Sequence, residues 1–487
     1  MDGLECSEIS YKNIISNNDV FRFDSEYFKK ESVALINTIY NRNYDLIGNH
    51  FDVSKLAGFE YTKYFTEENM SSNNVYIAIT SKNVKSERLL LDDVLTIDKT
   101  IADEYLGRSK LKPKDVVLSY TGEYRRALTL EINNVQLGPN VCRLTPKDNA
   151  INSYYLSSFL NCPVGQKILD KEKTLSAQPT VAMSRIRNIP IPLLSNKFQN
   201  IIEEIIRWAN ISILEADNKY STAKAILFNE LNYRPDEICR DSIAIKFLSQ
   251  INTTDKRIDA EFYQPKYEQL LSILTSNAKY TKTIAELATY NARGIQPIYV
   301  ENGKLDVINS KHILETSLDY GNFEKAELAL WKDNPKARVF MYDILIYTTG
   351  ANIGRTAAYL SDKKAIASNH VNILRLKKSI NNIYVAFVIN SQIGKLQIDR
   401  YSAGSAQQEL YPKDIENIVI PFIDESQQQK ISECILDSYK EKDIGLATIN
   451  LVQKAVSIAI KQNETEAIAW LKGKGIHWSV LKNMDYE

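Results

Sequence analysis

Apolar residues recur at alternating spacings of four and three positions in two long stretches of the chain. The first stretch covers residues 202–227 and the second covers residues 431–456. This heptad pattern is typical of a helix that packs lengthwise against another helix. The second stretch is weaker in its middle, where Lys442 and Gly445 take positions that the pattern assigns to apolar residues.

Each of these helices could extend over roughly 35 residues, or about 50 Å. An isolated amphipathic helix more often packs only on the core of its own domain. Because both apolar seams are long and share one register, pairing of the two helices is the favoured interpretation. The positions expected to pair are Ile202, Ile206, Ile213, Tyr220, Leu227, Ile431, Ile435, Ile449, Val452 and Val456.

The rest of the chain mixes strand-like and helix-like patterns. β-rich runs are VYIAIT (75–80), DVVLSY (115–120), VFMYDILIYTT (339–349) and VNILRL (371–376), whereas SYYLSSFLN (153–161) has helical spacing. Polar loops containing Gly and Asn separate these runs. The pattern predicts an α+β fold.

The sequence also repeats itself. The segment SAQQELYPKDIENIVIP (405–421) shares eight of seventeen residues with SAQPTVAMSRIRNIPIP (176–192), whereas unrelated segments would share about one. Upstream of these segments, DILIYTTG (343–350) corresponds to DVVLSYTG (115–122). A repeat this long indicates two copies of a domain, because solenoid repeats have periods of about 20 to 50 residues.

These observations predict two tandem α/β domains, each followed by a long helix, with a pseudo-twofold axis relating the two copies. The expected parts are a first domain at 1–197, a central helix at 198–233, a hinge and second domain at 234–426, a second helix at 427–462 and a C-terminal tail at 463–487.

Composition and missing motifs exclude several kinds of enzyme. Sixty Lys and Arg balance sixty Asp and Glu, and this zero net charge argues against a free-standing nucleic-acid binder. No two prolines are adjacent, so the chain lacks the Asn/Asp-Pro-Pro-aromatic motif with which amino-methyltransferases hold a flipped base. It also lacks the GxGxxG and P-loop motifs of nucleotide binding and the HExxH and GxSxG motifs of hydrolases. Methyl transfer, ATP hydrolysis and hydrolase chemistry are therefore not indicated. The five cysteines lack the spacing of zinc ligands. We therefore expect no catalytic residue, no metal and no cofactor.

No apolar run suggests a membrane span, and the N-terminal residues do not resemble a signal peptide, so a cytoplasmic location is expected.

Polar loops follow strands at matching positions in the two halves. Arg, Asn, Gln and Thr side chains match base edges and phosphates, and Gly lets the backbone approach a groove. One such loop would be interpreted as an ordinary hairpin with capped turns, but its recurrence in both halves favours DNA contact. The candidate DNA-binding residues are Tyr120, Thr121, Gly122, Tyr124, Arg125, Arg126, Gln178, Arg293, Gln296, Lys311, His312, Thr348, Thr349, Gly350, Asn352, Arg355, Asn369, His370, Ser405 and Gln407.

Taken together, these features resemble the specificity subunit of type I restriction-modification systems. Each half contains a strand followed by a Thr-x-Gly-like loop and closes with an Ile-Pro-x-Pro-like segment, a Gln and a long helix. The closing segments are residues 189–192 with Gln199, and residues 418–421 with Gln427 and Gln428. The resemblance covers the chain to about residue 460.

The resemblance implies a recognition role without catalysis. In that family each half is a target-recognition domain that reads one part of a split DNA sequence. The two long helices pair antiparallel as a coiled coil that sets the gap and docks two methyltransferase subunits. Restriction or translocase subunits join through those partners. The expected partners here are therefore double-stranded DNA, two methyltransferase subunits and, through them, restriction subunits.

One departure from the family is visible. Many members begin each half with a Pro-x-Gly-Trp-like segment, whereas this chain has RFDSEYF (22–28) and RIDAEFY (257–263) near those places. A reader subunit of an orphan or other phage-defence methylation system is one alternative. A repeat scaffold that binds only proteins is another, and an enzyme with disguised motifs is the one that the missing motifs disfavour.

Overall fold

The computed structural model describes residues 8, 10–16, 24–25, 27–91, 94–122, 125–174, 177–241, 243–247, 249, 251, 258–350, 352–402 and 409–474. The chain divides into two compact units. Unit 1 comprises residues 1–213 and 443–487, and unit 2 comprises residues 214–442. The division falls within both long helices, and the domain limits proposed from the sequence stay a prediction.

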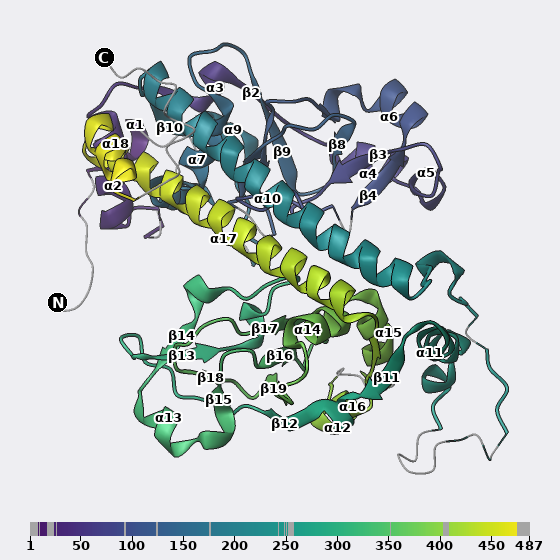
Figure 1. The fold of residues 1–487 in the computed structure, drawn as a ribbon. Coiled ribbons are helices and arrows are strands. Elements are labelled where there is room, and N and C mark those ends of the chain that lie inside the picture. The colour runs from purple at the N-terminus through teal and green to yellow at the C-terminus, as the bar shows by residue number, and fades with distance from the viewer. Residues whose placement is uncertain are drawn as a thin grey trace. The chain divides into compact units, whose positions relative to one another are not determined.

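Unit 1 begins with a mixture of short helices and strands and ends with parts of the two long helices (Figure 1). Its elements are α1 (Tyr11–Ser16), α2 (Lys30–Tyr40), β1 (Tyr44–Leu46), α3 (Ile47–His50), β2 (Phe51–Lys55), α4 (Gly58–Tyr64), α5 (Glu67–Met70), β3 (Val75–Ile79), β4 (Leu95–Asp98), α6 (Lys99–Tyr105), β5 (Lys110–Leu111), β6 (Val116–Ser119), β7 (Ala127–Thr129), β8 (Val135–Leu137), β9 (Val141–Pro146), α7 (Ser153–Asn161), α8 (Pro163–Glu172), α9 (Met183–Arg187), β10 (Pro190–Pro192), the first part of α10 (Asn196–Glu230), the last part of α17 (Glu425–Lys461) and α18 (Glu464–Lys472).

Unit 2 has an equivalent series of elements. They are the rest of α10, η4 (Ala260–Tyr263), α11 (Pro265–Asn277), β11 (Tyr280–Thr283), α12 (Ile284–Leu287), β12 (Ala288–Arg293), β13 (Leu305–Ile308), η5 (Ser310–His312), β14 (Glu324–Ala326), α13 (Ala329–Asp333), β15 (Arg338–Val339), β16 (Ile344–Tyr347), β17 (Thr356–Ala358), β18 (Ala365–Ala367), β19 (Val371–Leu376), α14 (Asn382–Asn390), α15 (Gln392–Ser402), α16 (Pro412–Glu416), β20 (Val419–Phe422) and the first part of α17. The fold is thus mixed α and β, as the sequence predicted.

The strand order is the same in the two units. Unit 1 contains the sheets β2-β9-β6-β7, β4-β3-β8-β5 and β1-β10, and unit 2 contains β12-β19-β16-β17, β14-β13-β18-β15 and β11-β20. In each four-stranded sheet of the second type, one pair of strands is parallel, β3 with β8 and β13 with β18. The repeated sequence therefore folds into one topology twice.

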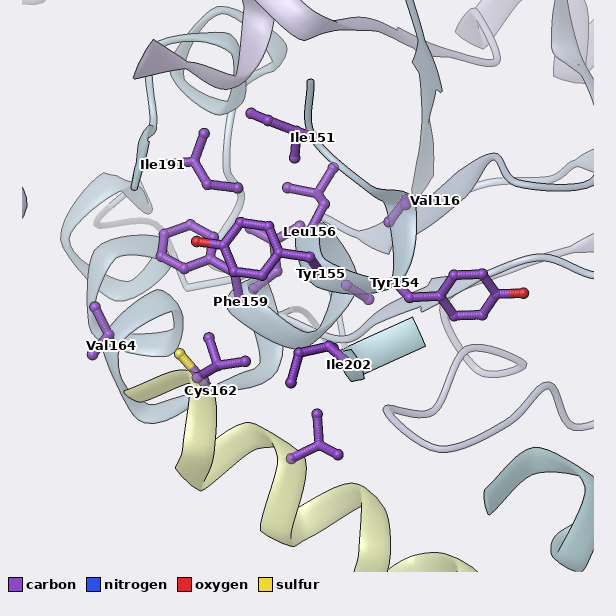
Figure 2. Packing of buried hydrophobic residues seen from close by; sticks show 14 of the residues in the cluster. Val116, Ile151, Tyr154, Tyr155, Leu156, Phe159, Cys162, Val164, Ile191 and Ile202 are labelled. Atoms are coloured by element: carbon purple, nitrogen blue, oxygen red, sulfur yellow. The ribbon is translucent and has the colours of Figure 1, made fainter. Parts of the chain in front are cut away.

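Specific side chains hold the same places in both copies. The hydroxyl of Tyr155 donates to the carbonyl of Pro192 at 2.8 Å, and that of Tyr384 donates to Pro421 at 2.6 Å. These hydrogen bonds join α7 to β10 and α14 to β20. Figure 2 shows Tyr155 in the core of unit 1, where α7 presents it beside Phe159. Each buried hydroxyl has a partner, which a buried phenol requires.

The glutamine after each Ile-Pro-x-Pro-like segment fixes the start of the long helix. Gln199 donates to the carbonyl of Leu194 at 2.8 Å, and its side-chain oxygen accepts the N–H of Asn152 at 2.7 Å. Gln428 likewise donates to Ile423 at 2.8 Å. Because the last residues before a helix lack intrahelical partners, a buried amide that binds them defines where the helix begins.

The motif near the start of each half has a packing role. In unit 1 the ammonium of Lys171 lies 3.1 Å from the ring centroid of Tyr27, and in unit 2 the guanidinium of Arg400 lies 4.3 Å from that of Phe262. Both rings are buried. The aromatic residue of RFDSEYF and RIDAEFY thus docks beneath a cation of α8 or α15.

The predicted seam positions lie in the cores of their own units. In unit 1, Ile202, Ile206 and Ile213 share a hydrophobic cluster with Ile449, Val452 and Val456. In unit 2, Leu227 shares a cluster with Ile431 and Ile435, and Tyr220 packs against it. Both clusters also contain sheet-covering helices, so each seam contacts the other long helix and the core of its unit.

By length and hydropathy alone, α17 could also cross a membrane. Its most apolar 18-residue window has a mean hydropathy of 1.3, but half of that window is buried within the structure. The residues that raise the hydropathy, such as Val452 and Val456, are the ones packed in the core of unit 1.

Gly445, which the sequence placed at a weak point of the seam, allows close approach of α10 in unit 1. A Cβ atom at this position would lie 2.6 Å from Cγ1 of Ile213 and 2.9 Å from the carbonyl oxygen of Ala209. Both distances are shorter than van der Waals contact. The missing side chain is therefore a packing requirement.

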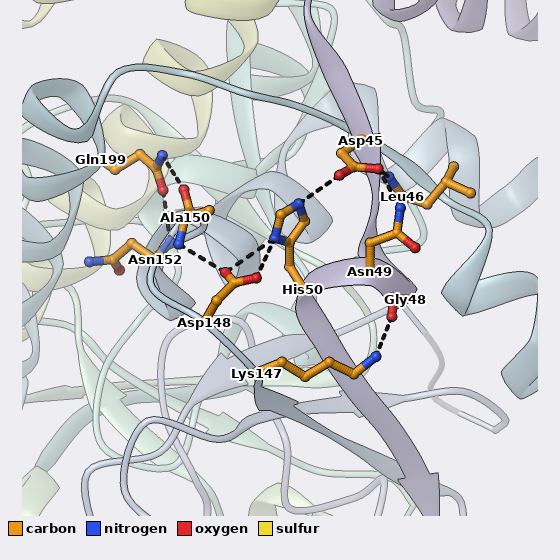
Figure 3. A network of polar contacts seen from close by, with 10 residues as sticks. All are labelled: Asp45, Leu46, Gly48, Asn49, His50, Lys147, Asp148, Ala150, Asn152 and Gln199. Carbon is orange, nitrogen blue, oxygen red and sulfur yellow. Dashed lines mark hydrogen bonds and ion pairs between the residues drawn. The ribbon is translucent and has the colours of Figure 1, made fainter.

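A cluster of charged groups joins β1 and α3 to the loop before α7 (Figure 3). Nε2 of His50 lies 2.9 Å from a carboxylate oxygen of Asp45, and Nδ1 lies 2.9 Å from one of Asp148. Partial burial raises the pKa of both aspartates, but hydrogen bonds from backbone N–H groups and from His50 outweigh it, so both pKa values lie below the usual value.

We predict that Gly445→Ala destabilises the protein by about 1–2 kcal/mol, because overpacking outweighs the helix propensity of Ala. Ala447→Gly, two residues along on the exposed side of α17, serves as control. Helix propensity alone predicts that Gly445→Ala raises the midpoint of denaturant unfolding and that Ala447→Gly lowers it. We expect both changes to lower the midpoint. A higher midpoint for Gly445→Ala would show that the helices have room to adjust.

We further predict an acid-dependent loss of stability from the His50 cluster. Because the folded pKa values of Asp45 and Asp148 are lowered, their contribution is complete above about pH 4 and is lost as the pH falls through the folded values. Asp148→Asn should cost up to about 1 kcal/mol at pH 7, and the cost should shrink as the pH falls below about 4. Thermal unfolding between pH 3 and 7 measures this, with the exposed Asp52→Asn as control. A deficit that stays constant with pH would contradict the expectation.

Candidate nucleic-acid interface

In unit 1 the first candidate loop is the tight connection between β6 and β7. The N–H of Arg125 donates to the carbonyl of Ser119 at 2.9 Å, and the N–H of Ser119 donates to Arg126 at the same distance. Gly122 and Arg125 have φ values of 74° and 73°. Two positive φ angles close the loop sharply, and Gly122 takes one of them without steric strain.

This loop is tied to the segment that precedes α9. Thr121 and Thr180 form an isolated antiparallel bridge, and the hydroxyl of Thr180 donates to that of Thr121 at 2.9 Å. The N–H of Val181 donates to the carbonyl of Tyr120 at 2.9 Å. Gln178 belongs to the same segment and is exposed. The two polar segments that the sequence singled out in the first half therefore lie side by side.

The charged groups at this edge are paired within unit 1. Arg125 forms an ion pair with Asp170 of α8, and both side chains remain about one-third exposed, at 33% and 36%. The ammonium of Lys55 lies 5.3 Å from the ring centroid of Tyr120. Burial, followed by the nearby Cys142 thiol, raises the pKa of Tyr120, so the phenol stays neutral and can donate a hydrogen bond.

In unit 2 the corresponding loop connects β16 and β17. Thr349 bridges Glu409, and the N–H of Leu410 donates to the carbonyl of Thr348 at 2.9 Å. The N–H of Thr348 donates to the carbonyl of His370 at 3.1 Å. Gly354, with φ 85°, has no room for a side chain, because a Cβ atom there would lie 2.8 Å from Cδ1 of Ile398.

Arg293, at the end of β12, joins this edge through three consecutive residues. Its guanidinium pairs with the carboxylate of Glu409, donates to the carbonyl of Leu410 at 2.7 Å and lies 4.8 Å from the ring centroid of Tyr411. The hydroxyl of Tyr411 also donates to Glu409 at 2.8 Å. The hydrogen bonds from Arg293 and then from Tyr411 hold the pKa of Glu409 below its usual value.

The described candidate residues of the second half lie near the ends of strands at one edge of the sheets, and two of them, Thr348 and His312, are buried. Strand β18 runs parallel to β13, so Asn369 and Lys311 follow strands that end at the same edge, and Ile295, next to Gln296, bridges Ser368. Lys311 is exposed and pairs with Glu324. Beside them stand the loop residues Thr348, Thr349, Gly350, Asn352, Arg355 and His370.

His312 lies inside the fold. Its side chain is 1% exposed, lies 5.3 Å from Phe323 between ring centroids, and accepts the N–H of Asn309 through Nδ1 at 2.9 Å. Burial, followed by the charge of Lys311, lowers the pKa of His312, which therefore stays neutral. As a candidate for direct DNA contact it requires correction, because it caps a turn inside the fold.

Tyr124, Ser405 and Gln407 lie outside the described residues. Sequence reasoning missed four residues that shape the two edges, which are Lys55, Asp170, Glu409 and Tyr411. Glu409 could have been noticed because it aligns with Thr180 in the repeat, but its partner Arg293 lies 116 residues away. Among the described residues, no group of three or more His, Cys, Asp or Glu side chains is arranged to hold a metal ion.

Comparison with known proteins agrees with these observations. The family model described as the type I restriction modification DNA specificity domain matches residues 277–452. No curated protein sequence matches the chain.

Three solved structures are similar over most of the chain. The S subunit of a type I restriction-modification system from M. genitalium is 12% identical, covers 86% of this chain and 96% of its own, and has a TM-score of 0.41. The HsdS subunit from Thermoanaerobacter tengcongensis is 11% identical over 89% and 96%, with a TM-score of 0.27. A structure concerned with assembly of the type I R-M system is 11% identical over 86% and 98%, with a TM-score of 0.29.

Because these TM-scores lie below 0.5, the match of the family model carries the assignment. The match confirms the resemblance to the type I specificity subunits over residues 277–452.

Proposed function

We propose that this chain is the DNA sequence-recognition subunit of a type I restriction-modification complex, in which each unit reads one part of a bipartite site. The observation that carries the proposal is the recurrence of one edge in both units. In each, a loop after the central strand is bridged to a second polar segment, Thr121 to Thr180 and Thr349 to Glu409.

The side chains on the two edges suit different half-sites. The first edge offers Arg125, Arg126 and Gln178, and the second offers Asn352 and Arg355. Arg prefers guanine and Asn or Gln prefers adenine in the major groove. Because the scaffold is shared and these residues differ, the two units would read unrelated sequences. The other candidate contact residues, except the buried His312, stay part of this proposal.

The long helices would set the distance between the half-sites as an antiparallel coiled coil. Contacts within each unit support this arrangement. In unit 1 Gly445 adjoins Ala209, and in unit 2 Ser438 donates to the carbonyl of Ala216 at 2.7 Å. Later residues of α10 thus meet earlier residues of α17. The proposal includes a pseudo-twofold relation between the two target-recognition domains, which the shared topology of the two units supports.

The exposed sides of the helices would dock two methyltransferase subunits. Ile211 in unit 1 is 55% exposed, and Leu214 and Leu436 in unit 2 are 59% and 39% exposed. Large apolar side chains on a helix surface are suited to bury against a partner. Methyltransferase partners would also supply phosphate contacts, which accounts for a reader with no net charge.

The chain itself would be non-catalytic and cytoplasmic, and restriction subunits would bind through the methyltransferases. Members of the specificity-subunit family recognise DNA and leave the chemistry to partner chains. A reader for an orphan methylation system would use the same two edges. A scaffold that binds only proteins would not need Arg, Gln and Asn at corresponding strand ends.

We predict that exchanging residues 257–426 for the same region of another specificity subunit changes one half of the methylated motif. Modified-base sequencing of DNA from cells that express the chain with its methyltransferase measures this. A bipartite adenine motif in which only one half changes supports the proposal. If a stable complex forms and no interrupted motif appears, the protein-only scaffold becomes the better interpretation.

We also predict that Ile211→Glu weakens binding of the methyltransferase subunit by about tenfold or more, because a charge replaces an apolar contact. Asn200→Glu adds the same charge to another exposed position of α10 and should have little effect. Titration calorimetry measures both affinities. Equal binding by the two variants would place the docking surface elsewhere.

A further inference from the structure

The second edge contains polar atoms that the fold leaves without partners. In the part of the chain that the structure describes, eleven side-chain nitrogen or oxygen atoms are buried with no hydrogen-bond partner. Five of the eleven lie together at the ends of β12, β16, β18 and β19. They are Nε of Arg293, Oγ1 of Thr348, Oγ1 of Thr349, Oγ of Ser368 and Oδ1 of Asn372.

Strand pairing brings these five residues together. Arg293 and Ile346 are both paired with Asn372, and Thr348 follows β16 by one residue. The N–H of Val371 donates to the carbonyl of Ser368 at 3.0 Å, which folds Ser368 back beside β19. Thr348 and Asn372 are fully buried, and Ser368 is 2% exposed. Buried polar groups are normally paired, so such a concentration calls for a physical reason.

In unit 1 the polar side chains at the equivalent positions have different partners. There Thr121 accepts a hydrogen bond from Thr180, whereas Thr349 faces Glu409, whose carboxylate is turned to Arg293. Lys55 stands where unit 2 has Arg293, because Lys55 is paired with Cys142 as Arg293 is with Asn372. The repeat therefore shows that this topology does not require an Arg–Glu pair or an unpaired threonine.

We infer that this edge of unit 2 is a binding site for a DNA backbone phosphate, and that Glu409 takes the place of that phosphate in the free protein. The inference rests on the proposed function and deepens it.

The chemistry of the unpaired atoms favours an anion. The guanidinium of Arg293 and the hydroxyls of Thr348, Thr349 and Ser368 are donors, and only the Asn372 oxygen must accept. A guanidinium binds carboxylate and phosphate through the same parallel hydrogen bonds. A phosphate also presents more acceptor oxygens than a carboxylate, so it can engage Arg293 together with hydroxyls that Glu409 leaves unpaired.

Displacement of Glu409 has a consequence for selectivity. Tyr411 holds the carboxylate through its hydroxyl, and Arg293 holds it through its guanidinium. DNA must compete with this internal anion before it gains the contact. The competition weakens binding to every sequence equally, so only DNA that also makes good base contacts binds well.

The first test is Glu409→Gln in the full chain assembled with its methyltransferase subunits, with a random-sequence 30-base-pair duplex as probe. Removing the internal anion should raise affinity about three- to tenfold and steepen the slope of log affinity against log salt by about one. Arg293→Ala should weaken binding and make that slope shallower by about one. Unchanged affinity and slope in both variants would overturn the inference.

A matched pair of threonine variants gives a second readout. Thr349→Val removes an unpaired hydroxyl and should raise the melting temperature while weakening DNA binding. Thr121→Val removes a paired hydroxyl at the equivalent position of unit 1 and should lower the melting temperature. A stabilising Thr349→Val that leaves DNA affinity unchanged would mean that the hydroxyl is not used by the ligand.

Inorganic phosphate distinguishes the two possible sources of the anion. We expect millimolar phosphate to raise the melting temperature of Glu409→Gln only slightly and to compete weakly with the duplex. Strong competition would identify a free anion as the ligand and overturn the assignment to DNA. The half-exchange experiment tests the proposed function separately, because the methylated motif does not depend on this salt slope.

Discussion

Each candidate reading edge depends on one pair of contacts between backbone groups. The residue after the central strand accepts a hydrogen bond from the segment that leads towards the long helix, Tyr120 from Val181 and Thr348 from Leu410, both at 2.9 Å. These contacts join two loops that are distant in sequence into one surface. Without them neither loop would have a defined position relative to the helix that follows, and base edges can be distinguished only by side chains held in register.

A constant framework surrounds this variable edge. The Tyr155 and Tyr384 hydroxyls bind equivalent proline carbonyls, and Asn161 and Asn390 accept the N–H of equivalent strand residues at 2.9 and 3.0 Å. These four side chains of the framework are therefore paired in the same way in both units. Loops that contribute little to that framework can change without loss of the fold, which is the condition under which binding residues diverge.

The features that sequence could predict are those that depend on local pattern. The heptad spacing predicted the two long helices, which are α10 and α17, and strand-like runs became β6 and β16. Patterns of apolar and polar residues express burial directly, so these predictions succeed. Gly445 interrupted the pattern, and its role appears only once the distance to Ala209 is known.

The features that sequence could not predict depend on side chains from distant segments. His312 resembles an accessible polar group, yet Phe323 covers it. The partner of Glu409 is Arg293 because β12 pairs with β19 and Leu410 is hydrogen-bonded to Thr348, the residue after β16. The repeat aligned Glu409 with Thr180, but a change from hydroxyl to carboxylate does not reveal which cation it will reach.

Under the proposed function, the paired arginines would be the cations that a neutral protein presents to DNA, and the two edges would respond differently. Arg125 is held by Asp170 of α8, outside the bridged segments, so a phosphate that competes for it leaves the bridge to Thr180 intact. Arg293 is held by the bridged segment itself, through Glu409 and Leu410. Competition for Arg293 therefore acts on the contact that positions the second loop. Under the proposed function, recognition by unit 2 would therefore be coupled to a local rearrangement, whereas unit 1 would bind with its edge already formed.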